Sequence, residues 1–427
     1  MNSIEAKYRA RTPRSEALQR RAELVMPGGE TRSGSFHAPY SVTMDHAAGC
    51  RSWDVDGNEY IDVVNNFTCL VHGHAYPPII EAAQEAVRKG TTWTAKAVDQ
   101  INLAELIVDR VKSIDMVRYA NSGSEGVFAA LAVARAYNQR TKLLVARYSY
   151  HGHFLETSVV SQFPAGAGQA GISNGWVGTY VADFGDAAAF EQILAEHGDE
   201  IAAVMLEPYM AFAGMVSAPP EFFQRVHAAA RKAGALFILD EATVFRLDIG
   251  GAQARLGIEP DVTVLGKIVA GGFPGGGIGG KREFMELLDP RGTRLHLSGT
   301  FTGNPVTMAA GLACMRHLTA EKIARQEQMM ETIETRLHAM AAKHGLPFST
   351  RRVGSMMQMY FSPTAPSASP LRQDEETATL FQLACMANGI FMVVRATMNV
   401  STVMTDADVD EVCERLDRAV ADVAGEI

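Results

Sequence analysis

The sequence predicts an α/β protein, with a large domain built on a mostly parallel sheet and a smaller α+β domain. Between residues 104 and 268, short apolar segments alternate with helical patterns, which is the order of strand–helix–strand units. After Asn304-Pro305, two long helical patterns and two strand-like segments replace this alternation. With 427 residues, 47% of them hydrophobic, the chain is long enough for more than one core.

Composition excludes several classes of protein. The net charge of -9 and the lack of a basic block argue against a nucleic-acid partner. No apolar run is long enough to span a membrane, and the charged N-terminus does not resemble a secretory signal. The five cysteines show no metal-type clustering, so we expect no metal site and reduced thiols in a cytoplasmic protein. These cysteines are Cys50, Cys69, Cys314, Cys385 and Cys413.

The N-terminal region predicts a helix followed by a hairpin. Residues Ser15–Leu24 alternate polar and apolar at helical spacing, and Pro27-Gly28-Gly29 ends that helix. Residues 50–62 carry the turn Asp56-Gly57-Asn58 between alternating apolar residues, which is typical of a β-hairpin.

The central region predicts five strands and four helices. The strands are apolar runs of four or five residues, at Met116–Ala120, Lys142–Ala146, Ala202–Leu206, Ala235–Leu239 and Val262–Leu265. The helices have apolar residues at helical spacing, at Ile79–Lys89, Ala104–Val111, Gly126–Tyr137 and Phe222–Ala233. Two glycine-rich stretches interrupt the pattern. We interpret Phe163–Gly175 as a mobile lid and Gly271–Gly280 as a turn between neighbouring strands.

The C-terminal region predicts three helices and two strands. They are expected at Val306–Arg316, Ala320–His344, Gly354–Phe361, Ile390–Val394 and Asp406–Val423. This gives a division into an N-terminal segment (1–70) that packs on the small domain, a large domain (71–305) and a C-terminal small domain (306–427).

Two predicted strands end in residues with complementary chemistry. One strand leads into Asp240, and another leads into Gly266-Lys267. Ligands bind outside the carboxyl ends of parallel strands, so both side chains are expected at one edge of the sheet. A lysine amine can form a Schiff base with pyridoxal 5′-phosphate, and a carboxylate can pair with its pyridine nitrogen. Taken alone, each residue is more often an ordinary strand-end aspartate or a solvated lysine.

Loops after other strands offer further partners for such a cofactor. In the loop Ser122-Gly123-Ser124, backbone N–H groups and a hydroxyl could approach a phosphate at a helix N-terminus. The ring of Tyr150 could stack on the cofactor, although a tyrosine packs in a core equally often. The loop 298–305 offers hydroxyls near a turn. Each feature is common in proteins, so only their combination indicates a cofactor site.

The motifs NSGSEG, YHGH, EP, LDEA, LGK and SGTFTGNP together resemble those of the class III, fold-type I pyridoxal-phosphate aminotransferases. The order and spacing match from about Pro27 onward. The branch most resembled contains the glutamate-1-semialdehyde aminomutases and the β-amino-acid aminotransferases. The resemblance implies the fold-type I architecture, pyridoxal 5′-phosphate as cofactor and transaminase activity.

The resemblance also implies roles for individual residues. Lys267 would be the Schiff-base lysine and the proton-transfer base, and Asp240 would hold the pyridine nitrogen. Gly123 and Ser124 would bind the phosphate, and Tyr150 would stack on the ring.

Three more positions follow from the same resemblance. Thr300 would reach the phosphate of a neighbouring subunit, which implies a homodimer with the active site at the subunit interface. Glu207 would be an acid near the ring. Ala242 stands where the family usually has a valine, which predicts a thinner sandwich around the ring.

Two arginines are candidate ligands of substrate carboxylates. Arg32 follows the Pro27-Gly28-Gly29 turn, where related enzymes place such an arginine, and Arg395 matches an arginine of the β-amino-acid aminotransferases. The planar guanidinium binds a carboxylate through two charge-assisted hydrogen bonds. Both could instead be surface ion pairs, and Arg246 is interpreted as structural. Aromatic and apolar residues in candidate loops could line the substrate site, namely Phe36, Tyr40, Phe67, Tyr209, Met210 and Phe212.

These features predict transfer of an amino group from an amino acid, in particular a β-amino acid, or from an amine to a keto acid such as 2-oxoglutarate or pyruvate. One alternative is the glutamate-1-semialdehyde aminomutase reaction. The segment Arg395–Asn399 argues against it, because aminomutase relatives have an acid there and this chain has none. Another reaction of the cofactor on the same fold stays open. A catalytically silent binding protein is a further alternative, which the presence of Lys267 and Asp240 disfavours.

Overall fold

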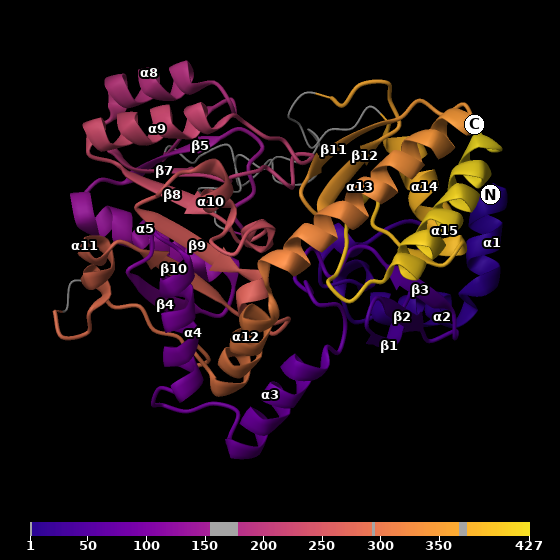
Figure 1. Ribbon diagram of the computed structural model, residues 1–427, viewed down its shortest axis with the longest axis horizontal. Coiled ribbons are helices and arrows are strands. Elements are labelled where there is room, and N and C mark those ends of the chain that lie inside the picture. Colours follow the sequence, from indigo (N-terminus) through magenta and orange to yellow (C-terminus); the bar gives the residue numbers. More distant parts are fainter. Residues whose placement is uncertain (1, 154–177, 293–294, 367–373) are drawn as a thin grey trace. The chain divides into compact units, whose positions relative to one another are not determined.

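The computed structural model describes residues 2–153, 178–292, 295–366 and 374–427 (Figure 1). The expected lid at residues 163–175 lies outside these ranges. The described chain divides into two compact units. The first contains residues 2–76, 321–366 and 374–427, and the second contains the described part of residues 77–320.

The second unit is built on a seven-stranded sheet in the order β4-β10-β9-β8-β7-β5-β6. Neighbouring strands run parallel from β9 to β6, which confirms the predicted mostly parallel sheet. Its core strands β7, β8 and β9 are buried along their whole length, as continuous apolar runs require. The strands are β4 (Met116–Ala120), β5 (Lys142–Ala146), β6 (Thr179–Ala182), β7 (Ile201–Leu206), β8 (Leu236–Asp240), β9 (Val262–Gly266) and β10 (Gly276–Gly280).

The prediction of a turn over Gly271–Gly280 was wrong for its second half. Gly276–Gly280 forms β10, which runs antiparallel between β4 and β9 and is buried throughout. Close backbone approach explains the glycines: a Cβ added at Gly277 would lie 2.4 Å from the carbonyl oxygen of Arg118. The glycines that suggested a turn therefore allow a tightly packed strand.

Helices cover both faces of this sheet (Figure 1). Apolar residues of α5 and α11 share one core with strand residues, and those of α8 and α9 share a second core on the other face. The helix α12 packs on α3 and α4, and it belongs to this unit although the sequence-based division places it in the C-terminal domain. The helices are α3 (Pro77–Lys89), α4 (Val98–Arg110), α5 (Gly123–Asn138), α8 (Ala187–His197), α9 (Pro220–Ala233), α10 (Ala252–Leu256), α11 (Arg282–Met285) and α12 (Pro305–His317).

The first unit contains two small sheets and one core. One sheet has the order β1-β2-β3-β13 and the other has the order β11-β12-β14. Antiparallel β2 and β3 confirm the predicted hairpin, and the strand expected at Ile390–Val394 is limited to two residues. The elements are α1 (Ser3–Arg11), α2 (Pro13–Glu23), β1 (Met44–Ala48), β2 (Arg51–Asp54), β3 (Glu59–Asp62), α13 (Ala320–Lys343), β11 (Ser349–Val353), β12 (Met356–Tyr360), α14 (Glu375–Ala387), β13 (Ile390–Phe391), β14 (Thr397–Asn399) and α15 (Asp406–Ala424).

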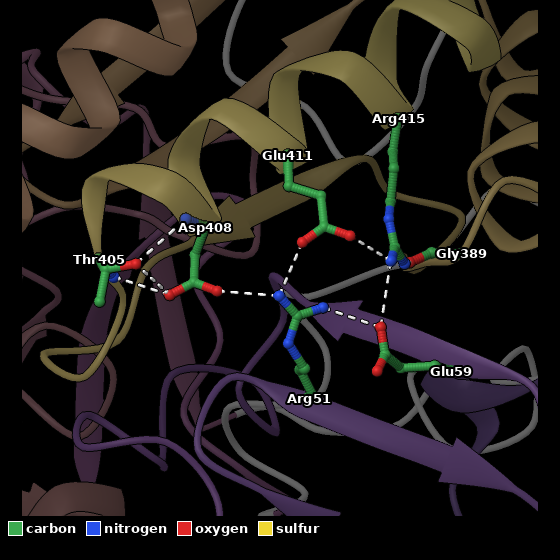
Figure 2. A network of polar contacts seen from close by, with 7 residues as sticks. All are labelled: Arg51, Glu59, Gly389, Thr405, Asp408, Glu411 and Arg415. Carbon is green, nitrogen blue, oxygen red and sulfur yellow. Dashed lines mark hydrogen bonds and ion pairs between the residues drawn. The ribbon is translucent and has the colours of Figure 1, made fainter.

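An ionic network joins the hairpin to the C-terminal helix α15 within this unit (Figure 2). Arg51 Nη1 donates to Glu59 Oε1 at 2.8 Å, and its Nη2 donates to Asp408 Oδ1 at 3.0 Å and to Glu411 Oε2 at 2.7 Å. Arg415 also bonds Glu59 and Glu411, so two guanidinium groups share three carboxylates.

The network changes the acidity of its carboxyl groups. Hydrogen bonds from Arg51, together with those from Arg415, lower the pKa of Glu411. Burial alone would raise the pKa of Asp408, but hydrogen bonds from Thr405 and the charge of Arg51 lower it. Since folding lowers both pKa values, these groups stabilise the fold above their ordinary pKa, and this stabilisation is lost as the pH falls through the lowered values.

We expect Arg51→Met to destabilise the protein by about 1–2 kcal/mol at neutral pH, because three partly exposed ion pairs are worth about 0.2–1 kcal/mol each. Urea denaturation measures the change, and the difference from the unsubstituted protein should shrink in acid. Arg20→Met is the control, because Arg20 is exposed and forms an ion pair with Glu16 across one helix turn. Equal loss in both variants would contradict a special contribution of the network.

Within the described ranges, no helix is both long and apolar enough to cross a membrane. None of the five cysteines, all of which lie in the described ranges, forms a disulfide.

Candidate active site

Four adjacent strands of the second unit deliver chemical groups to one edge of the sheet. Lys267 follows β9, Asp240 ends β8, Glu207 follows β7, and Tyr150 lies in the loop after β5. These strands are neighbours and run parallel, so their carboxyl ends lie side by side. The sheet topology therefore gathers residues that are up to 117 positions apart in the sequence.

Asp240 is a buried carboxylate held from two sides. Its Oδ2 lies 2.8 Å from Nδ1 of His151, and its Oδ1 accepts the backbone N–H of Ala242 at 3.0 Å. The His151 side chain is fully buried and that of Asp240 is 6% exposed. Such a carboxylate has a defined position and can pair with a cationic N–H group of a ligand.

Glu207 is a second buried acid at this edge. Its Oε1 accepts a hydrogen bond from the backbone N–H of Tyr150 at 2.9 Å. This bond connects the loop after β5 to the end of β7. Burial raises the pKa of Glu207 to about 7, although the charge of His151 and the hydrogen bond from Tyr150 oppose this shift. Near neutral pH this carboxyl group is therefore present in both its protonated and its ionised form.

The raised pKa of Glu207 predicts a pH-dependent loss of stability. Folded protein holds this proton more tightly than unfolded protein, so stability should fall as the pH rises from about 4.5 to about 7. Glu207→Gln removes the titrating group and should reduce this fall by an amount on the order of 2 kcal/mol. Urea denaturation across this pH range measures the slope. The exposed Glu221→Gln variant should keep the original slope, and an unchanged slope in Glu207→Gln would contradict the assignment.

Lys267 begins a short 3-10 helix with φ of 51°, a left-handed conformation that non-glycine residues rarely adopt. Its Nζ donates to Oγ1 of Thr243 at 2.7 Å. Backbone strain of this kind persists only where the surroundings impose it, and it is common at functional sites. Thr243 thus gives the amine of Lys267 a defined position.

The predicted phosphate loop lies at the N-terminus of α5. The hydroxyl of Ser122 accepts the N–H of Glu125 and caps the helix, whereas Oγ of Ser124 accepts the N–H of His153 at 3.3 Å. The loop from β5 packs directly on this turn, because a Cβ at Gly152 would lie 2.2 Å from the Ser124 hydroxyl.

Ala242 connects this loop to the lysine strand. A Cβ added at Gly123 would lie 3.5 Å from the Ala242 methyl group, and one added at Gly266 would lie 3.0 Å from it. The methyl group of Ala242 therefore lies between Gly123 and Gly266, the residue that precedes Lys267. A larger residue there has little room on the glycine side.

Tyr150 and Phe212 form an aromatic pair. Their rings are nearly parallel, with an interplanar angle of 18° and a centroid distance of 5.0 Å. Phe212 lies in a loop closed by hydrogen bonds between the backbones of Met210 and Val216.

Thr300, the residue expected to reach a partner subunit, is exposed. Its carbonyl oxygen lies 3.5 Å from Oγ1 of Thr92.

The two candidate carboxylate ligands belong to the first unit. Arg32 is exposed, and its Nη1 donates to Oδ1 of Asn66 at 2.8 Å. Arg395 is half-buried between β13 and β14. Of the residues proposed to line the substrate site, Tyr40 and Met210 are core residues of the first and second units respectively.

The residues at the sheet edge fit pyridoxal 5′-phosphate. Asp240 is a buried acceptor for a pyridine N–H, Lys267 is an amine for an aldehyde, and the α5 N-terminus offers N–H groups to a phosphate. His151 and Thr243 were not predicted as site residues, whereas Phe212 was predicted to line the substrate site. His151 was within reach of sequence analysis, because it directly follows Tyr150 in the YHGH motif.

Known proteins that are similar to this chain belong to a family of pyridoxal-phosphate enzymes. The family model of class III aminotransferases matches residues 34–420. A glutamate-1-semialdehyde 2,1-aminomutase of Myxococcus xanthus is 37% identical over 82% of this chain and 83% of its own length.

Two solved structures are similar to almost the whole chain. An omega-transaminase from Sphaerobacter thermophilus has a TM-score of 0.89 at 33% identity, covering 96% of this chain and 97% of the other. A β-phenylalanine aminotransferase from Variovorax paradoxus also has a TM-score of 0.89, at 31% identity, covering 99% and 97%. They confirm the predicted fold-type I architecture.

Proposed function

Because the chain belongs to the class III aminotransferases, which are pyridoxal-phosphate-dependent enzymes, we propose that it transfers an amino group from a β-amino acid or amine to a keto acid. The acceptor would be 2-oxoglutarate or pyruvate. Support for a β-amino acid comes from the similarity to the β-phenylalanine aminotransferase, together with the two arginines of the first unit.

When bound, the cofactor supplies an aldehyde that reacts with amines and a ring that accepts the electron pair released at the carbon bearing nitrogen. The chain would supply the rest. Asp240, oriented by His151, would pair with the ring nitrogen, and Ser122-Gly123-Ser124 would hold the phosphate. Tyr150 would pack on the ring, next to Phe212.

Lys267 would hold the cofactor and then move a proton. Its amine, positioned by the Thr243 hydroxyl, would remove the proton from the carbon bearing nitrogen and return it to the cofactor side. Glu207 would support the loop that carries Tyr150, through the hydrogen bond to its N–H group.

The observation that carries intermolecular transfer is the chemistry of the segment Arg395–Asn399. It contains one arginine and no carboxylate. An acceptor such as 2-oxoglutarate has two carboxylates, which Arg32 and Arg395 could bind as two separate cations. A β-amino acid donor has one carboxylate and needs only one of them.

A second candidate function is the aminomutase reaction. The 37% identity to the Myxococcus xanthus aminomutase over most of both chains favours it. The two functions differ in one requirement, because an aminomutase needs no separate amino acceptor.

A half-reaction measured by absorbance tests the proposal. The holoenzyme is mixed with one amino compound at a time: β-phenylalanine, α-phenylalanine, a simple aromatic amine or glutamate-1-semialdehyde. We expect β-phenylalanine to convert the cofactor from its aldehyde form to its amine form fastest, and 2-oxoglutarate to reverse the change. Catalytic conversion of glutamate-1-semialdehyde without an acceptor would instead establish the aminomutase reaction.

We expect Arg32→Ala to raise KM for β-phenylalanine by about tenfold to a hundredfold, because a charge-assisted pair to the carboxylate is worth about 1.5–3 kcal/mol. The KM for 1-phenylethylamine, which has no carboxylate, should change much less. Arg14→Ala, an exposed arginine of α2, is the control. Equal changes for both donors would show that Arg32 does not bind the carboxylate.

We further propose a homodimer in which Thr300 reaches the phosphate of the partner subunit. Exposed large apolar residues of the second unit would be covered in such a dimer; Phe301 directly follows Thr300, and Trp93 directly follows Thr92, which is hydrogen-bonded to Thr300. They include Trp93, Val98, Ile101 and Phe301. We also propose a location in the cytoplasm, which is supported by five cysteines that form no disulfide.

A further inference from the structure

A left-handed turn in the first unit combines four strained residues. Asn65, Asn66, Phe67 and Thr68 have φ values of 48°, 48°, 54° and 75°. Single non-glycine residues adopt this conformation uncommonly, and a run of four needs surrounding contacts that impose it. The turn follows β3, whose last residue is Asp62.

Asp62 anchors the beginning of the turn. Its Oδ1 accepts the N–H groups of Val64 at 2.7 Å and Asn65 at 2.9 Å, and its Oδ2 lies 2.6 Å from Nε2 of His74. The end of the turn is closed by a hydrogen bond from the N–H of Leu70 to the carbonyl of Asn65 at 3.0 Å.

Two buried asparagines link the turn to β14. The side-chain amide of Asn65 donates to the carbonyl of Asn399 at 2.9 Å, and the amide of Asn399 donates to the carbonyl of Val64 at 2.7 Å. The backbone N–H of Asn399 also donates to the carbonyl of Val63 at 2.7 Å. Both side chains are buried, with exposures of 0% and 2%. This reciprocal pair fixes the distance between the two backbones.

Each side of this pair is connected to one of the candidate carboxylate ligands. On the turn, Asn66 directly follows Asn65, and its Oδ1 accepts the hydrogen bond from Arg32. On the other side, Arg395 lies four residues before Asn399, and its carbonyl accepts a hydrogen bond from the Gln358 side chain on the neighbouring strand β12. Both arginines are thus connected to the same buried pair, Arg32 through its hydrogen bond to Asn66 and Arg395 through the four residues that lead to Asn399.

We propose that the left-handed turn, pinned by the Asn65–Asn399 pair, positions Arg32 through Asn66 relative to the segment that carries Arg395. This inference rests on the proposed function, in which both arginines bind carboxylates. The pair then determines which separation between two carboxylates the enzyme accepts. Asn65, Asn66 and Asn399 are positioning residues, because they act on the substrate through the arginines.

Binding of two unreactive carboxylates to the holoenzyme, measured by calorimetry, tests this inference. Glutarate can engage both arginines at once, whereas 3-phenylpropanoate can engage only one. Asn399→Ala removes one donor of the pair. We expect the Kd of glutarate to rise about tenfold to a hundredfold, since misplacement of binding groups by about 1 Å has effects of this size. The Kd of 3-phenylpropanoate should rise less than threefold.

A second variant covers the case in which Asn399→Ala does not fold. Asn66→Gly keeps a residue that tolerates positive φ and removes only the exposed side chain that holds Arg32. It should show the same preferential loss of glutarate binding. Asn388→Ala is the matched control. It removes an amide in the same unit that donates to the Ala384 carbonyl at the end of α14 and to Asp422, and it should change neither Kd.

The outcomes separate this inference from the proposed function. If Arg32→Ala and Arg395→Ala leave glutarate binding unchanged, the arginines are not carboxylate ligands and the proposed site fails. If both arginine variants lose glutarate binding but Asn66→Gly does not, the positioning role is overturned. Parallel weakening of both carboxylates in Asn66→Gly would likewise overturn it, because a general structural effect does not discriminate between them.

Discussion

Turnover by Lys267→Ala should fall by at least roughly 10⁴-fold with every amino donor, because the change removes the side chain that we propose both attaches the cofactor and transfers the proton. Proton transfer by a positioned side chain alone is worth about 10²–10⁴-fold. Lys267 lies at the carboxyl end of β9, and its Nζ donates to Thr243. No other lysine is in the stretch from Asp240 to Gly280.

A measurement independent of turnover accompanies this prediction. Borohydride reduction followed by mass spectrometry should attach the cofactor permanently to the peptide that contains Lys267. The variant should show no such attachment. Lys281→Ala is the control, because Lys281 directly follows β10 and makes a partly exposed pair with Glu259. Attachment to a different lysine, or turnover within about tenfold of the unsubstituted enzyme, would refute the role of Lys267.

For Asp240→Asn we expect a fall in kcat of about 10²–10³-fold, the size found when one preorganised electrostatic partner is removed from an active site. An amide has nearly the same shape, so packing should be preserved. It carries no negative charge, however, and would no longer favour a protonated ring nitrogen. The absorbance spectrum of the bound cofactor and its dependence on pH should change together with kcat.

Asp248→Asn provides the matched control for this substitution. Asp248 is a carboxylate a few residues further along the chain, where its Oδ1 accepts the N–H of Gly250 at 3.0 Å. It should leave the cofactor spectrum and its pH profile unchanged. If Asp240→Asn kept both kcat and the spectrum, the ring nitrogen would have another partner and the assignment of Asp240 would fail.

The His151–Asp240 pair illustrates a contact that only the folded chain creates. The two residues are 89 positions apart, and the motif that contains His151 gives no indication of its partner. The pairing depends on β5 and β8 both lying next to β7, with their carboxyl ends at the same edge. Strand order follows from packing of the whole sheet, so it is not encoded in either segment alone.

Local patterns were nevertheless sufficient for the larger part of the second unit. Apolar runs that end in Asp240 and Gly266-Lys267 are β8 and β9, because continuous burial on both faces requires such runs. The hydroxyl-rich and glycine-rich loop at 122–124 is the start of α5, where the Ser122 side chain caps the helix. Strand ends and helix caps are local, and the sequence by itself therefore determined the local structure around the residues that we propose hold the cofactor.

Tertiary structure decided what local patterns could not. Gly276–Gly280 has the composition of a turn, yet it is a buried strand, because the neighbouring atoms leave no space for side chains at its four glycines. The strained turn at Asn65–Thr68 has no sequence signature, since its conformation depends on Asp62 and on Asn399, more than 330 residues away. Long-range hydrogen bonds impose these conformations against local preference, and for this reason only the folded chain reveals them.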